Sequence, residues 1–273
     1  MKTKTLILSV FIALCMVSCE NQNGKHEESE NSEATQHDTI AENHEGKKHW
    51  SYEGETGPSH WAELEKEGVC DGVNQSPINI ITKDVVVDPS LKTVEINYSS
   101  TTKIHDVLNN GHTIQYNVDK GDFITYNEEK FDLAQIHFHS PAEHTINGVR
   151  YPIEIHLVHK NANNQLAVFS VMAQEGESNK TFEFLESYLP VAKDETKTVD
   201  ASCDLNLNLP KDKKYFYYVG SLTTPPCTEG VNWFVFNSTI TISVEQVKKL
   251  QELMPINNYR PENPLNGRIV KTK

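Results

Sequence analysis

From residue 49 onward, the chain consists of short runs that alternate apolar with polar residues and are broken at Gly, Pro, Asn or Asp. Examples are TVEINY (93–98), HTIQYNV (112–118), FDLAQIHFH (131–139), IEIHLVH (153–159), LAVFSVMA (166–173), YFYYVGSL (215–222) and VNWFVF (231–236). Runs of this kind, rich in β-branched and aromatic residues, predict β-strands. Helical spacing is limited to SHWAELE (59–65), TFEFLESYLP (181–190) and SVEQVKKLQELM (243–254), where Ser243 is a candidate N-cap. The sequence therefore predicts one mainly β domain over residues 49–273.

The N-terminus has the features of an export signal. Two lysines precede an apolar run from Leu6 to Val17, which is shorter than the roughly 20 residues that a membrane span needs. The ending MVSC resembles a bacterial lipoprotein signal, in which Cys19 would be lipidated; the alternative is a plain signal peptide cut nearby. We therefore expect residues 1–19 to direct export to the bacterial cell envelope. A lipoprotein would be anchored there in the periplasm or at the outer membrane, whereas a simple cut would leave a soluble periplasmic or secreted protein.

Residues 20–48 form an acidic, polar segment that contains almost no apolar side chains. Such a segment cannot bury enough surface to offset the entropy of ordering, so we expect a disordered tether between the signal and the domain. The histidines in and beside it could bind metal loosely, although a solvated spacer explains them as well: His26, His37, His44 and His49. The net charge of −13 argues against a nucleic-acid partner.

Three of the five cysteines fall in the predicted domain. Cys15 and Cys19 belong to the signal, which leaves Cys70, Cys203 and Cys227. Because exported proteins meet oxidising conditions, we expect one disulfide and one unpaired thiol. The residues by themselves do not choose the pair.

Two histidine-bearing runs predict a metal site. Side chains alternate along a strand, so His137 and His139 share one face, and Glu154 and His156 share a face of the next run. The segment between the runs, with its Pro and Gly, suits a return to an antiparallel neighbour, which would bring His137, His139 and His156 together. Three protein ligands leave a fourth tetrahedral position open, as in catalytic zinc sites. The alternative is that these are ordinary buried or surface histidines of a sheet.

Several longer motifs resemble the α-class carbonic anhydrases. QIHFHSPAEHTING, IEIHLVHKN, VGSLTTPPCTEGVNWFV, NQSPINI, NNGHTIQYNV and YRPENPLNGR occur between Trp50 and Arg268 in the family's order and spacing. The resemblance implies the fold of that family, a large twisted, mostly antiparallel sheet with short peripheral helices. It also implies a zinc enzyme that hydrates CO2 to bicarbonate through a zinc-bound hydroxide, and the family is itself the standard example of zinc lowering the pKa of bound water to about 7.

The same resemblance assigns roles around the metal. The implied zinc ligands are His137, His139 and His156, steadied by Gln135, Asn258 (through its carbonyl) and Glu154, respectively. Thr223 would orient the nucleophile by donating its proton to Glu143, and Thr224 would contact bicarbonate. The resemblance also implies that His144 and His159 are structural, that Cys70 pairs with Cys227, and that Cys203 stays an unpaired thiol.

The resemblance also implies how substrate and protons are handled. CO2 would lie against an apolar wall formed by Val158, Val168, Leu222, Val231 and Trp233. His112 would carry the proton away, helped by Tyr52, Asn110 and Gln115, which would order a water chain; Gln115 stands where many animal enzymes have Asn. Without the resemblance, the five residues of the apolar wall would be interpreted simply as part of the hydrophobic core.

Two other function classes fit parts of the sequence. One is a carbonic-anhydrase-like binding module that has lost catalysis, which the intact set of histidines argues against. The other is a histidine-rich metal scavenger that uses the tether, which predicts that removing residues 20–48 would change activity. For partners, we expect CO2 and bicarbonate, a membrane contact only through the N-terminal lipid, and a possible homodimer.

Overall fold

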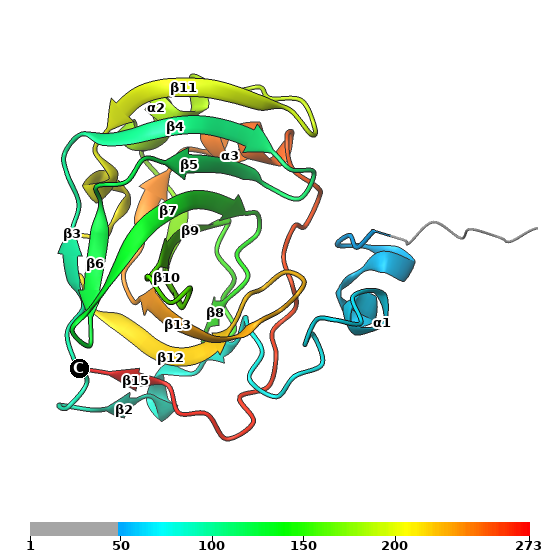
Figure 1. The fold of residues 1–273 in the computed structure, drawn as a ribbon, viewed down its shortest axis with the longest axis vertical. Helices are drawn as coiled ribbons and strands as arrows, with labels where there is room; N and C mark the ends of the chain where they lie inside the picture. Colours follow the sequence, from blue (N-terminus) through cyan, green and yellow to red (C-terminus); the bar gives the residue numbers. More distant parts are fainter. Residues whose placement is uncertain (1–48) are drawn as a thin grey trace, which may run out of the picture. The chain divides into compact units, whose positions relative to one another are not determined.

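The alternating runs form one large, curved sheet in the computed structural model, which describes residues 49–273 (Figure 1). Its 13 strands run in the order β11-β4-β5-β7-β9-β10-β13-β12-β15-β2, with β14 paired to β10 and β6 placed between β3 and β7. The strands are β2 (Val86–Val87), β3 (Glu95–Asn97), β4 (Thr102–Asn109), β5 (Ile114–Val118), β6 (Phe123–Tyr126), β7 (Glu129–His139), β9 (Ile153–Lys160), β10 (Leu166–Glu175), β11 (Thr196–Cys203), β12 (Tyr215–Ser221), β13 (Glu229–Phe236), β14 (Ile240–Ile242) and β15 (Lys271–Thr272).

Most neighbours in this sheet are antiparallel. The parallel pairs are β10 with β13, β10 with β14, and β15 with β2. Two further strands, β1 (Asn79–Ile80) and β8 (Thr145–Ile146), form a separate parallel pair. The prediction of a mainly β domain with a mostly antiparallel sheet is confirmed.

The helices are short and peripheral, as predicted. They are α1 (Trp61–Leu64), α2 (Lys180–Glu186) and α3 (Val244–Gln251), with 3-10 turns η1 (Gly54–Thr56), η2 (Pro58–His60), η3 (Thr82–Asp84) and η4 (Leu205–Asn208). α3 begins at the predicted cap: the Ser243 hydroxyl accepts from the Gln246 backbone N–H at 3.2 Å, and the Gln246 side chain accepts from the Ser243 N–H at 3.2 Å. Such a capping box satisfies two otherwise unpaired backbone donors, and a cap is worth about 1 kcal/mol.

The two faces of the sheet carry different side chains. On β10, Phe169 and Val171 point into a large apolar core, whereas Val168 and Met172 point into a smaller one on the other face. α2 covers the larger core: the Tyr116 hydroxyl of β5 donates to the Leu185 carbonyl at 2.8 Å. Because β7 and β9 send Ile136, Phe138, Ile155 and Leu157 into this larger core, His137, His139 and His156 share the face of the smaller one.

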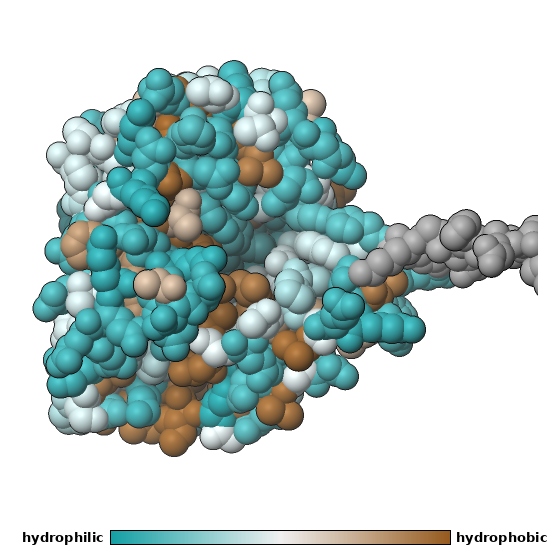
Figure 2. Space-filling model, in the orientation of Figure 1, coloured by the Kyte–Doolittle hydropathy of each residue, from teal (hydrophilic) through white to brown (hydrophobic). Residues whose placement is uncertain are grey.

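Hydrophilic residues cover most of the face shown in Figure 2, and hydrophobic ones gather on its lower part, over β12, β15 and β2. The exposed apolar side chains of β2 and β12 are Val86, Val87 and Val219. Within residues 49–273, no helix has both the length and the apolar character needed to span a membrane. The predicted signal, the lipidation at Cys19 and the tether at 20–48 lie outside the described residues.

Candidate metal centre

Strand register brings three histidines of the predicted metal site together. β7 and β9 are antiparallel neighbours in which His137 lies directly opposite His156, and His139 follows two residues later on the same face. The candidate ligand atoms of the three rings all lie within 4.8 Å of one another, and His137 Nε2 is 3.1 Å from His156 Nδ1. We call these three residues the inner site.

Each ring of the inner site has an acceptor behind it. His137 Nδ1 lies 2.8 Å from Gln135 Oε1, His139 Nδ1 lies 2.7 Å from the Asn258 carbonyl, and His156 Nε2 lies 2.7 Å from Glu154 Oε1. An acceptor behind a ring places the proton on that nitrogen and leaves the opposite nitrogen bare. His139 Nε2, which faces the centre, is buried without a hydrogen-bond partner among the described residues. Three bare nitrogens therefore converge on one point.

Burial keeps these histidines uncharged. Desolvation lowers the pKa of His139 to about 4, and it lowers the pKa of His137 and His156 as well, with mutual repulsion among the rings adding to the effect on His137. A neutral imidazole is the form that binds a metal cation. The chemistry of the donor set fits zinc, whose open catalytic sites commonly use three protein ligands.

Glu154 is the centre of a buried polar network behind His156. Its carboxylate accepts from Ser170 Oγ at 2.6 Å and from the backbone N–H of His144 at 2.8 Å, and it lies 2.7 Å from His144 Nδ1. Burial raises the pKa of Glu154, but attraction to His144 and His156 outweighs it, so the pKa lies well below its usual range. Although His144, Glu154 and His156 cluster closely enough to hold a cation, their facing atoms already bond one another. This cluster is therefore a positioning network.

Thr223 and Glu143 lie together beside the inner site. Thr223 follows the end of β12 and is buried, and its side chain lies close enough to the Glu143 carboxyl to lower the pKa of that group. Glu143 Oε2 is buried without a hydrogen-bond partner among the described residues. Glu143 Oε1 accepts from the Arg260 backbone N–H at 3.0 Å, and Glu143 Oε2 lies 3.4 Å from His139 Nε2. Burial raises the pKa of Glu143 to about 7, opposed by His156, Thr223 and the Arg260 N–H. Thr224 is next along the turn, and its backbone carbonyl accepts from the Cys227 N–H at 2.8 Å.

The predicted substrate wall is one apolar cluster. Val158, Val168, Leu222, Val231 and Trp233 all belong to the smaller core or pack against it. The Trp233 ring lies 5.0 Å from the His156 ring, and its Nε1–H donates to the Ser221 carbonyl at 3.0 Å. The wall therefore borders the inner site on the side of His156.

His112 lies in the turn between β4 and β5. The Asn110 side chain accepts from the His112 N–H at 3.0 Å and so holds this turn. The buried Tyr52 lies beside His112, with 6.2 Å between ring centroids, and Gln115 is paired with His137 across β5 and β7. Burial lowers the pKa of His112 to about 4, and repulsion from His49 and Lys193 adds to this effect.

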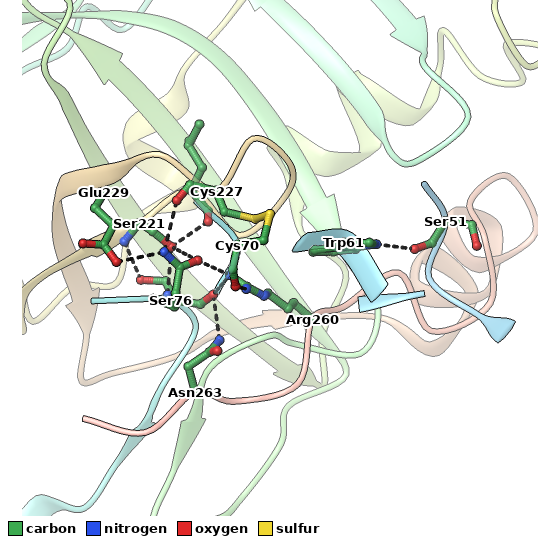
Figure 3. Close-up of a disulfide and its surroundings, with 11 residues drawn as sticks. Ser51, Trp61, Cys70, Ser76, Ser221, Cys227, Glu229, Arg260 and Asn263 are labelled. Atoms are coloured by element: carbon green, nitrogen blue, oxygen red, sulfur yellow. Dashed lines mark hydrogen bonds between the residues drawn. A yellow bond between two sulfur atoms is a disulfide. The ribbon is translucent and has the colours of Figure 1, made fainter. Parts of the chain in front are cut away.

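A disulfide joins Cys70 to Cys227, the pair that the resemblance implies, and Cys203 is a free thiol (Figure 3). The buried Arg260 lies beside this disulfide: its guanidinium donates to the Cys70 carbonyl at 2.7 Å and to the Ser76 carbonyl at 2.9 Å. Since the Arg260 backbone N–H holds Glu143, one residue connects the disulfide region to the inner site.

Asn258, two residues earlier, makes further contacts besides its carbonyl to His139. Its side-chain oxygen accepts from the Ser140 N–H at 2.7 Å, and its amide donates to the His112 and Phe138 carbonyls at 3.0 Å. The segment around Asn258 and Arg260 therefore joins the metal ligands, the His112 turn and the Glu143 carboxyl.

Four contacts near the site were not foreseen. Ser170 bonds Glu154, and the Tyr218 hydroxyl lies 2.6 Å from His144 Nε2. A lone Ser inside the apolar run LAVFSVMA was a usable signal for the first of these. Trp50 stacks on His112 with 3.6 Å between centroids, and His49, grouped from sequence with the tether histidines, lies 2.9 Å from His112 through their Nε2 atoms. The last two contacts join residues that are more than 60 positions apart in the sequence, and no local sequence pattern predicts them.

The comparisons with known proteins agree with this geometry. The family model of eukaryotic-type carbonic anhydrases matches residues 56–273. A carbonic anhydrase from Klebsiella pneumoniae is 42% identical over 226 residues, covering 81% of this chain and 90% of that protein.

Two solved structures share the fold. The α-carbonic anhydrase from Thermovibrio ammonificans, solved with the inhibitor sulfanilamide, is 40% identical with a TM-score of 0.78, covering 82% of this chain and 98% of that one. Dioscorin, solved with ascorbate, is 32% identical with a TM-score of 0.76, covering 82% of this chain and 98% of that one. The extent and identity of these matches show that the chain belongs to the α-class, or eukaryotic-type, carbonic anhydrase family.

Proposed function

We propose that this chain is a zinc enzyme that catalyses the reversible hydration of CO2 to bicarbonate and a proton. The observation that carries the proposal is the inner site. Its three uncharged imidazoles, two buried and one half-buried, direct their bare nitrogens to one point, and each has an acceptor behind it. Zinc held by His137, His139 and His156 would supply a Lewis acid that activates water, and carbonic anhydrases are themselves the standard example of this three-histidine arrangement.

Thr223 and Glu143 orient the attacking oxygen. When ionised, Glu143 accepts the Thr223 hydroxyl proton, so the Thr223 oxygen presents its lone pairs to the metal centre. It can then accept a hydrogen bond from a protonated oxygen but offers nothing to an oxygen that lacks a proton. This arrangement fixes the direction of attack and contributes through orientation. Thr224 would contact the bicarbonate product.

The apolar wall suits CO2, which has no net dipole and needs only a weak, dry contact. Val158, Val168, Leu222, Val231 and Trp233 provide that surface beside His156. Bicarbonate, being charged, binds poorly against the same wall, which favours its release. His112 would then move the proton from the site towards solvent, across water ordered by Tyr52, Asn110 and Gln115.

A stopped-flow assay of CO2 hydration with a pH indicator tests the proposal. The purified protein should contain about one zinc per chain, lose hydration activity when a chelator removes the metal, and regain it when zinc is added back. Hydration at the same rate by metal-free protein would overturn the proposal.

A second candidate function, a binding module without catalysis, is favoured by the likeness to dioscorin, whose solved complex contains ascorbate. The two candidates differ in the same assay, because a binding module would retain its fold and metal but show no hydration above the buffer rate. Calorimetric titration with ascorbate would then show binding.

We further propose that the chain is exported and held at the cell envelope by a lipid on Cys19, and that the domain can form a homodimer. Mass spectrometry of the N-terminal peptide should show an acylated Cys19. Light scattering coupled to size-exclusion chromatography should give twice the domain mass. An unmodified peptide or the mass of a single chain would contradict the respective expectation.

A further inference from the structure

His49 and His112 form a close pair at the edge of the site, which we call the rim pair. Their Nε2 atoms lie 2.9 Å apart, and their ring centroids lie 5.0 Å apart. Two bare nitrogens at this distance would repel each other, as would two N–H groups. The contact is favourable only when one proton lies between the two Nε2 atoms. The geometry therefore describes two rings that share a proton.

The position of His49 is set by its neighbours. Trp50 lies flat on His112, with the planes 13° apart, and packs edge-on against the buried Trp61, with centroids 5.1 Å apart. The Trp61 Nε1–H donates to the Ser51 carbonyl at 2.8 Å, which anchors the backbone two residues beyond His49. These rings therefore hold the segment against the His112 turn and bring His49 to it.

The surroundings of the two rings differ. His112 is half-buried, and burial, then repulsion from His49 and Lys193, lowers its pKa to about 4, with Asp194 opposing the shift. A group that accepts a proton efficiently near neutral pH needs a pKa near that pH, so His112 alone is a poor final acceptor. His49 is exposed, so its ring is in direct contact with solvent. The same residues line a solvent-facing cavity of about 400 Å³, which gives buffer molecules access to the pair.

We propose that His49 and His112 act as a two-imidazole relay, in which His112 receives the proton released at the metal centre and His49 delivers it to buffer. This inference rests on the proposed function. One proton enters the pair at His112 and one leaves from His49; only N–H bonds form and break, and no electron is transferred. The charged intermediate is an imidazolium donating to a neutral imidazole, a charge-assisted hydrogen bond that is stronger than the neutral one.

Substitution of His49 tests the relay. In weak, non-imidazole buffer, His49→Ala and His49→Gln should lower kcat for CO2 hydration by ~3–10-fold, a partial loss of a proton-transfer contribution, while kcat/KM stays unchanged. The kcat–pH profile should change shape, and added imidazole should restore the wild-type rate. His60→Ala is the matched control, because His60 is a half-exposed histidine of the same segment that contacts Glu63. It should behave as wild type.

A second measurement does not depend on activity. Nitrogen NMR titration of the histidine rings should show one proton taken up by the pair before a second, well-separated step. His49→Ala should shift the titration of His112. Wild-type kcat for His49→Ala in weak buffer, or a loss that imidazole does not restore, would overturn the relay while leaving the proposed function intact. If the wild-type enzyme shows no hydration, the proposed function fails, and independent titration of the two rings would still refute the pair.

Discussion

The inner site and the rim pair are both made of histidines, but they are held in opposite ways. His137 and His156 lie opposite each other on neighbouring strands, and each ring of the inner site has a hydrogen-bond partner behind it. His112 lies in a turn, and His49, 63 residues away in sequence, contacts it through their Nε2 atoms while Trp50 stacks on the His112 ring. A metal ligand must keep its geometry, whereas a proton carrier must exchange with solvent. We therefore expect substitutions in the inner site to affect metal binding, and substitutions at the rim to affect only proton transfer.

The largest effect should come from removing an inner-site ligand. His137→Ala should lower zinc affinity by more than the ~10–100-fold that an outer partner contributes, and hydration should fall to the buffer rate. Metal analysis after dialysis, together with the stopped-flow assay, measures both. His105→Ala changes an exposed histidine on β4, two strands away from β7, and should retain full zinc and rate. Full zinc in His137→Ala would remove it from the ligand set.

The disulfide should have the next largest effect. The double variant Cys70→Ser, Cys227→Ser opens a link between residues 157 apart in sequence, and the free energy of unfolding should fall by about 4 kcal/mol. Chemical denaturation of the domain measures this change. Cys203→Ser is the control, since Cys203 is a free thiol and the change leaves the link in place. Equal stability of the double variant and the wild type would show that the fold does not depend on the link.

A smaller effect should follow from changing a partner of the inner site without touching a ligand. Glu154→Gln removes the charge that holds His144 and His156, so zinc affinity should fall by ~10–100-fold. Competition with a chelating dye measures the affinity. Glu95→Gln, an exposed carboxylate on β3, should leave it unchanged. A Glu154→Gln variant with wild-type affinity would show that strand register alone orients the ring.

The smallest change in chemistry should occur at the rim. His112→Ala should lower kcat by ~10-fold in weak buffer, less than the ~100-fold low end of general acid–base effects, and leave zinc content and kcat/KM unchanged. Stopped-flow rates at several buffer concentrations measure the separation. A matching fall in kcat/KM would mean that His112 also shapes the inner site, and the contrast between the two regions would then be lost.

Much of the fold was predictable because the central strands are long and alternate clearly. The alternating runs at β7, β9, β10 and β13 predict that these segments are strands, and they also predict which side chains share each face of the sheet. β4 and β11 gave weaker signals. TKIHDVLN mixes Asp and Asn, which have low strand propensity, with its apolar residues. TKTVDASC has mostly exposed side chains at the edge of the sheet. Their pairing depends on neighbours that a local pattern does not reveal.

The metal site was predictable for the same reason, since two-residue spacing on strands places His137 with His139 and Glu154 with His156. The contacts of Trp50, His49, Asn258 and Arg260 were less accessible. Each of these residues contacts a segment that is distant in the sequence and comes close only in the folded, curved sheet. No spacing of residues in the sequence predicts such a contact. Family resemblance supplied the role of Asn258, but the stacking of Trp50 and the position of His49 came from the folded structure.

The segment that contains Asn258 and Arg260 has a consequence for truncated forms of the gene product. A stop codon directly before residue 258 would spare His137, His139, His156, Thr223 and both disulfide cysteines. It would remove the acceptor behind His139, the donor that holds Glu143 and the amide that supports the His112 turn. The shortened product would have every residue that chelates the metal and would lack the parts that align them, so a premature stop this late should behave as a null allele.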